Sequence, residues 1–113
     1  MYYTDFHMHS NCSPDAYDTM ADMAHAAANF GLSEICFTDH CDMLELDLTP
    51  IKDFDMDPLK LQYNEALLKH GTDIKIRFGI ELSEGLENLA LSTKVLDDEM
   101  LDFVIGSAHF LPD

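Results

Sequence analysis

Hydrophobic positions along the chain recur first with a period of two and then with a helical period, which predicts strands and helices in turn. An aromatic-rich segment at residues 2–9 carries Asp5, His7 and His9 at a spacing of two. This spacing predicts a first strand that presents the three side chains on one face. Apolar residues then recur at helical spacing over residues 19–30, where we expect the first helix.

The same alternation continues to the end of the sequence. Short apolar runs predict three more strands, at residues 34–38, 74–82 and 103–106. Helical spacing predicts two more helices, at residues 57–71 and 87–97. Strands that alternate with helices imply an α/β fold with a parallel sheet, open or closed into a barrel, built here from about four βα units.

Length and composition place these elements in one domain. The chain has 113 residues, of which 47% are apolar and 25% are charged, as is ordinary for a globular domain. Its formal net charge of −16 would repel nucleic acid and anionic lipid, so we expect neither nucleic acid nor a membrane as partner. No apolar stretch approaches the ~20 residues of a membrane span and no secretion signal opens the chain, so we expect a cytoplasmic protein.

The three cysteines, Cys12, Cys36 and Cys41, are odd in number and form no C-x-x-C pair. This pattern argues against a disulfide framework and against a structural zinc knuckle, so we expect free thiols. Cys41 directly follows a candidate metal ligand and could lie near the site, but a small buried side chain is the simpler interpretation.

Candidate metal ligands gather where the predicted strands end. His7 and His9 form an H-x-H pair on one strand face, which alone is weak evidence for a metal. His40, Glu81 and His109 each follow a different apolar run, and parallel strands bring such ends to one edge of a sheet. A carboxylate such as Glu81 can bridge two cations, and imidazoles suit zinc, iron and manganese, so more than one ion is expected. The alternative is that these histidines are purely structural.

Four motifs that contain these residues follow one another along the whole chain, at Asp5–Ser10, Phe37–His40, Gly79–Glu81 and Val104–Phe110. Their order and spacing resemble the PHP (polymerase and histidinol phosphatase) family, in its histidinol-phosphatase branch. The resemblance implies a distorted seven-stranded (β/α)7 barrel with a trinuclear metal centre that hydrolyses phosphate esters. It further implies that His7, His9 and Glu81 bind one ion, Glu81 and His109 a second, and His40 a third.

Three aspartates complete the predicted site. The resemblance makes Asp5 and Asp39 catalytic-site groups that lie behind the metal ligands. Within Cys12–Asp15, many relatives place a histidine ligand of the third ion, and here Asp15 is the best candidate. A carboxylate at that position favours manganese or iron over zinc alone. The alternative is that Asp15 merely follows Pro14 in a turn.

The family's remaining strands have no counterpart in these 113 residues. Those strands would carry a further histidine ligand, a late Asp-x-His pair and the arginines that hold the substrate phosphate, whereas this sequence has only Arg77. Residues 1–113 therefore resemble the N-terminal half of a PHP domain. We expect this half to be poorly active by itself, and to form a homo-oligomer or associate with the missing half of the barrel.

The leading functional hypothesis is a metal-dependent phosphoric monoester hydrolase that converts L-histidinol phosphate to L-histidinol and phosphate in histidine biosynthesis. Residues Glu34–Asp42 resemble the histidinol-phosphatase branch of the family, and this resemblance motivates the choice of a small phosphorylated substrate. Two or three divalent ions (Zn, Mn or Fe) would offset the negative charge of the chain. Alternatives are a nucleotide or oligonucleotide phosphoesterase of the same fold and a non-catalytic metal-binding module. We also expect His7→Ala to lose more metal than Asp15→Ala, because His7 should hold the ion buried deepest among the strands.

Overall fold

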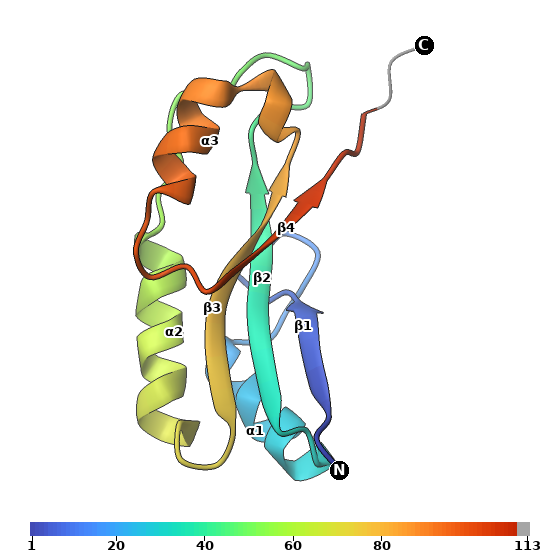
Figure 1. Cartoon of the computed structure of the whole chain (residues 1–113), viewed down its shortest axis with the longest axis vertical. Coiled ribbons are helices and arrows are strands. Elements are labelled where there is room, and N and C mark those ends of the chain that lie inside the picture. Colours follow the sequence, from blue (N-terminus) through green and yellow to red (C-terminus); the bar gives the residue numbers. More distant parts are fainter. Residues whose placement is uncertain (111–113) are drawn as a thin grey trace.

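Four parallel strands form one sheet in the order of the sequence, β1-β2-β3-β4, in the computed structural model of the chain (Figure 1). The structure describes residues 1–110. The strands are β1 (Thr4–Met8), β2 (Glu34–Asp42), β3 (Lys75–Ser83) and β4 (Phe103–Ser107). The helices are α1 (Met20–Phe30), α2 (Asp57–His70), the short 3-10 helix η1 (Gly85–Glu87) and α3 (Leu89–Leu96). The predicted α/β fold with a parallel sheet is confirmed, and its strands follow the order of the sequence.

Helix α1 begins and ends where its sequence provides hydrogen-bonding groups for the free helix termini. The Thr19 hydroxyl oxygen accepts a hydrogen bond from the Asp22 amide at 3.1 Å. Gly31 adopts the left-handed conformation, with φ of 103°, and its amide donates to the last carbonyl groups of the helix. These groups confirm the predicted helix at 19–30 to within one residue.

Three elements differ from the prediction, and the first is β1, which spans Thr4–Met8 instead of residues 2–9. The strand predicted at 34–38 continues to Asp42, because β2 pairs with β3 up to the partners Asp42 and Ser83. Polar residues at the end of β2 concealed this continuation, since they face a polar site instead of the core. The helix predicted at 87–97 divides into η1 and α3 at Asn88, whose side chain caps Leu91 and also donates to the Met43 carbonyl.

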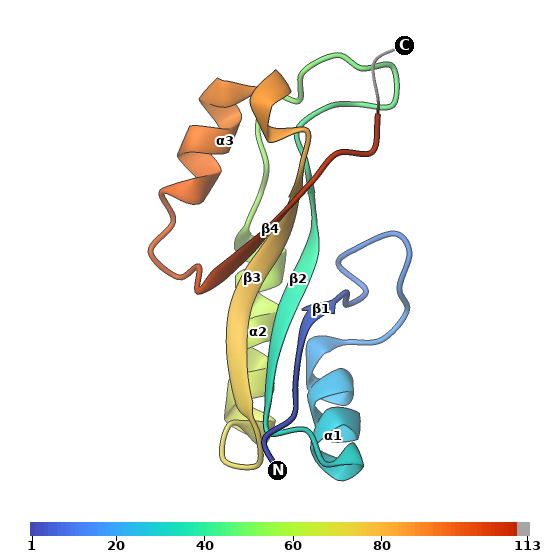
Figure 2. The same cartoon turned by 45° about the vertical axis from the view of Figure 1, so that its right-hand side comes forward.

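The sheet is curled into half a barrel. β1 and β4 are the outer strands, yet the rings of Phe6 and Phe103 on them meet edge to face with centroids 5.4 Å apart. Figure 2 shows β4 crossing over β3 and β2 toward the side on which β1 lies. This curvature brings the two ends of the sheet around one concave face.

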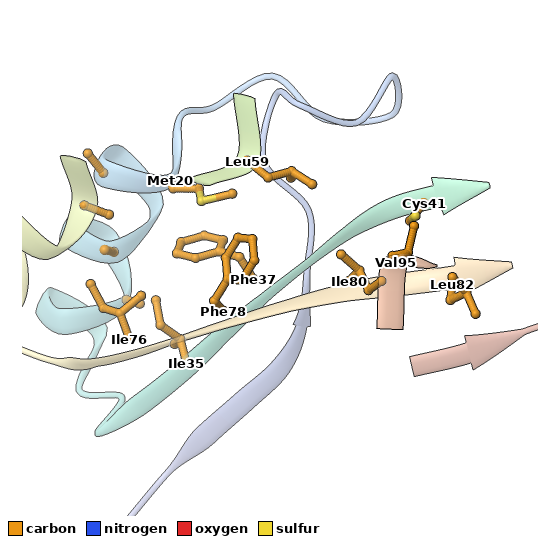
Figure 3. Packing of buried hydrophobic residues seen from close by; sticks show 14 of the residues in the cluster. Met20, Ile35, Phe37, Cys41, Leu59, Ile76, Phe78, Ile80, Leu82 and Val95 are labelled. Atoms are coloured by element: carbon orange, nitrogen blue, oxygen red, sulfur yellow. The ribbon is translucent and has the colours of Figure 1, made fainter. Parts of the chain in front are cut away.

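Side chains alternate between two faces along the central strands. Ile35 and Phe37 of β2 and Phe78 and Ile80 of β3 point toward the helices and form the core with Met20 (Figure 3). The positions in between point to the concave face of the sheet. Among residues 1–110, no helix is long and apolar enough to cross a membrane.

We predict that Gly79→Ala destabilises the fold because β4 lies against this glycine. A Cβ at Gly79 would lie 2.5 Å from the carbonyl oxygen of Phe103 and 2.9 Å from Cys36 Sγ. Overpacking of this kind costs about 1–3 kcal/mol of the free energy of unfolding, which urea denaturation measures. Gly106→Ala is the control, since nothing lies within 4 Å of its added methyl group. Equal stability of the two variants would contradict the prediction.

Candidate metal centre

The predicted ligands meet at the C-terminal ends of the strands. His40 on β2 and Glu81 on β3 are register partners, so both side chains point to the concave face. His7 lies on β1 and His9 directly follows it, while His109 lies two residues beyond the end of β4. The curvature of the sheet brings these outer positions to the central pair.

Glu81 lies among four imidazoles. Its Oε1 is 2.7 Å from His7 Nε2 and 3.0 Å from His9 Nε2. Its Oε2 is 3.3 Å from His109 Nε2 and 3.7 Å from His40 Nδ1. The two oxygens of one carboxylate therefore face two different sets of nitrogen atoms, which is the geometry of a carboxylate that bridges two cations.

The surroundings of Glu81 favour its ionised form. Burial raises the pKa of this carboxyl, whose side chain is only 5% exposed, but the hydrogen bonds with His7 and His9 and the electrostatic attraction of His40 and His9 together more than offset burial. The net result is a pKa below the ordinary value. The hydroxyl of Ser107 also donates to Oε2 at 3.2 Å and fixes the orientation of the carboxylate. Glu81 is thus held as an anion, the form that binds a cation.

A second group joins Asp15 to His9 and His40. Asp15 Oδ2 is 3.0 Å from His40 Nε2 and 3.1 Å from His9 Nδ1. Burial raises the pKa of Asp15, and its hydrogen bonds with these two histidines bring it below the ordinary value. Asp15 lies in a turn, as the alternative interpretation of the sequence held, and the turn places its carboxylate against both imidazoles.

His9 belongs to both groups through different nitrogen atoms. Nε2 faces Glu81, and Nδ1 faces Asp15. A neutral imidazole binds an ion through one nitrogen and donates a proton from the other, commonly to a carboxylate that orients the ring. The geometry therefore supports two arrangements, one with His9 beside His7 and Glu81, and one with His9 beside Asp15 and His40. In the first arrangement Asp15 orients His9.

The exposure of His7 does not support the expectation that His7 holds the most deeply buried ion. Its side chain is 61% exposed and that of Asp15 is 53% exposed, whereas His9 is 15% exposed. His7 therefore does not lie deeper than Asp15, and the expected order of metal loss between these two residues has no support in burial.

Neither of the two supporting aspartates contacts a ligand imidazole by hydrogen bonding in the described residues. Asp39 is fully buried and accepts hydrogen bonds from the Ser10 amide, the Ser10 hydroxyl and the Ser13 hydroxyl at 2.6–2.9 Å. Ser13 Oγ in turn accepts from the His40 amide at 2.9 Å. Asp5 accepts from the His7 amide at 3.0 Å on the surface. Asp39 thus holds the loop that carries Asp15. In the sequence, only Ser10 and Ser13 indicated this role.

The donor set fits a divalent cation. Among the described residues, ligand atoms of two groups lie within 4.8 Å of one another, namely those of His7, His9 and Glu81 and those of His9, Asp15 and His40. His40 Nδ1 is buried and has no hydrogen-bond partner within the same residues. Unpaired buried nitrogen is costly unless a cation or a proton acceptor satisfies it. Imidazole nitrogen with carboxylate oxygen suits zinc, manganese and iron.

The single arginine lies away from this site. Arg77 Nε donates to Glu34 Oε2 at 2.7 Å, near the opposite end of the central strands. The cysteines are free thiols as expected, and burial raises the pKa of Cys36 and of Cys41 to about 12. Within the described chain no thiol belongs to either candidate metal group.

Comparison with known proteins agrees with this geometry. The sequence profile described as PHP domain matches residues 5–113. The chain belongs to the PHP domain family. Curated relatives include the histidinol-phosphatase of Lactococcus lactis subsp. lactis (strain IL1403), 33% identical over 111 residues. Another is the probable histidinol-phosphatase of Deinococcus radiodurans, 28% identical over 116 residues. These alignments cover 96% and 95% of this chain but 40% and 42% of the relatives.

A solved PHP structure matches the half-barrel. It is the crystal structure of histidinol phosphate phosphatase from L. lactis, complexed with zinc, L-histidinol and phosphate. The two superpose with a TM-score of 0.82 at 28% identity, over 96% of this chain and 41% of the solved one. The chain thus spans about two-fifths of the length of the relatives it matches, and its four strands correspond to part of their barrel.

We predict that His9→Ala weakens metal binding more than either His7→Ala or Asp15→Ala. His9 contributes a nitrogen to both candidate groups, whereas each of the others contributes to one. Zinc content after equilibration, measured on the three purified variants, gives the order. A loss in His9→Ala no larger than that in His7→Ala would show that His9 acts in one group only.

Proposed function

We propose that this PHP chain provides the metal-binding half of a site that hydrolyses phosphate monoesters, with L-histidinol phosphate as the substrate. The observation that carries the proposal is Glu81, a buried carboxylate with His7, His9 and His109 around its two oxygens at the strand ends. The similarity to a zinc-containing histidinol phosphate phosphatase complexed with L-histidinol and phosphate supports the substrate.

Residues of this chain would hold the ions. His7, His9 and Glu81 would bind one ion, and His109 with the second oxygen of Glu81 would bind another. The group that contains His40 would bind a third. When bound, such ions supply the positive charge that activates water and neutralises phosphate oxygens. Glu81 keeps its orientation through Ser107. An open hollow of 330 Å³ is lined by His7, His9 and Asp15. An open hollow of this kind admits a small substrate.

The test compares hydrolysis of L-histidinol phosphate with that of a generic aryl phosphate after zinc, manganese or iron is added. We expect a preference for L-histidinol phosphate, even at low turnover. Equal and feeble hydrolysis of both compounds would contradict the substrate, and a chain that binds none of the three metals would contradict the site itself.

A non-catalytic metal-binding module is the second candidate for this chain alone. The position of Arg77 favours it, because the single arginine of the sequence is paired with Glu34 and does not reach the metal centre. Phosphate is commonly held by arginine, whose fork of donors matches two phosphate oxygens. Stoichiometric metal binding without hydrolysis of either phosphate ester would favour this second function.

We predict that the chain associates with a second copy of itself through the apolar surface formed by η1, α3 and the neighbouring edge strand β4. An apolar hollow of 490 Å³ beside β4 is lined by Leu86, Leu89 and Leu96, whose side chains are largely exposed. Exposed strand edges recruit other chains, although a net charge of −16 opposes association. The dimer fraction measured by light scattering should therefore rise with salt, which screens the charge.

Charged substitutions test which surface associates. Leu89→Glu should lower the dimer fraction, whereas Leu68→Glu on the exposed side of α2 is the control and should leave it unchanged. A monomer at every salt concentration would contradict the prediction.

A further inference from the structure

Strand β3 is followed by a residue in an unusual backbone conformation. Glu84 has φ of 60° and ψ of 37°, in the left-handed region that side chains other than glycine adopt rarely. Its side chain is nevertheless acidic and the residue is only 8% exposed. Conformations of this kind persist where the surrounding contacts determine them, and they concentrate at functional sites.

The amide and the carboxylate of Glu84 bind the last residue of β4 and the segment after it. The β3–β4 ladder ends with the partners Ser83 and Ser107, and the Glu84 amide then donates to the Ser107 carbonyl at 3.0 Å. The carboxylate oxygen Oε1 accepts hydrogen bonds from the amides of His109 and of Phe110, the second at 3.1 Å. Beyond the end of β4, the carboxylate of Glu84 thus accepts the backbone hydrogen bonds that a neighbouring strand would otherwise accept.

His109 has less support from strand pairing than His7 and His40 have. His7 and His40 lie within paired strands, whereas His109 lies two residues beyond β4 and its side chain is 44% exposed. Packing therefore contributes little to its position. Its imidazole nevertheless lies 3.3 Å from Oε2 of Glu81, and the backbone bonds to Glu84 are what hold the residue there.

We propose that Glu84 is a positioning residue that fixes His109 in the metal centre, an inference that rests on the proposed function. The left-handed turn directs its side chain to the segment after β4, where one carboxylate oxygen accepts hydrogen bonds from two successive amides. Charge-assisted hydrogen bonds to backbone amides are stronger than neutral ones, so the segment is held without a covering helix or strand. Glu84 itself lies outside both groups of candidate ligand atoms in the described residues.

The first test needs no metal. Amide hydrogen exchange at His109 and Phe110 is compared in the wild-type chain, in Glu84→Ala and in Glu84→Gln. We expect faster exchange at both amides in Glu84→Ala, and a smaller increase in Glu84→Gln, which keeps an acceptor oxygen but loses the charge. Circular dichroism checks that each variant is folded. Unchanged exchange in a folded Glu84→Ala would overturn the proposal whatever the metal results are.

The second test measures zinc affinity in a double-mutant cycle with His109→Ala. Groups that orient a metal ligand typically contribute about 10- to 100-fold to affinity, so Glu84→Ala should lose that much in the wild-type background. In the His109→Ala background it should lose nothing further, because Glu84 acts through His109. An equal loss in both backgrounds would overturn the positioning role. A wild-type chain that binds no zinc would instead contradict the proposed metal centre, which separates the two failures.

Discussion

Glu81→Gln is expected to lower zinc affinity by more than about 100-fold while the chain remains folded. Supporting groups behind a ligand typically contribute about 10- to 100-fold, and Glu81 touches the ion site directly, so its removal should cost more. Glutamine keeps the shape of the side chain but loses the charge that faces His7, His9 and His109. Competition with a chromophoric zinc chelator measures the affinity.

Glu87→Gln is the matched control, since Glu87 is an exposed acid on the neighbouring η1 and makes the same change in net charge. If Glu81→Gln binds zinc as tightly as the control, the ion lies only among His9, Asp15 and His40, and Glu81 bridges nothing. A loss confined to one of two bound ions would show that this second group holds an ion without Glu81.

The alternation of side chains explains why so much of the site was predictable. Once the parallel strands that carry His40 and Glu81 are recognised, the two side chains must share a face, because each lies three positions after a phenylalanine that points to the helices. The same argument places His7 and His9 on the same side of β1, where both contact one oxygen of Glu81. Strand order and ligand grouping thus follow from local patterns and from short right-handed connections.

Positions outside the regular strands were less predictable, because their side chains follow individual backbone angles. Alternation along β2 turns Asp39 away from His40, but no periodicity indicates that Ser10 and Ser13, in the loop after β1, would donate to it. The left-handed backbone conformation of Glu84 could not be predicted either, because a glutamate after a strand indicates nothing about its φ. The exposure of His7 also depends on how far the sheet curls, which hydrophobic patterns do not determine.

Asp39→Asn is expected to lower the free energy of unfolding by about 2–4 kcal/mol, the largest stability effect of the substitutions considered. Hydrogen bonds to a charged group contribute roughly 1.5–3 kcal/mol, and Asp39 accepts three of them in a fully buried position. Asparagine offers one acceptor oxygen, and its amide group would face the donors of Ser10 or Ser13. At least one buried donor is then left without a partner.

Asp5→Asn is the control for this prediction, because the resemblance to the family gave both aspartates the same role. Asp5 is exposed and, within residues 1–110, accepts a single hydrogen bond, from the His7 amide, so its replacement should change stability by less than about 1 kcal/mol. Urea denaturation with an unchanged slope measures both variants. Equal losses would mean that Asp39 is not the group that holds residues 10–13. A large loss in Asp39→Asn alone would show that the fold itself, before any metal binds, depends on one of the two aspartates and not on the other.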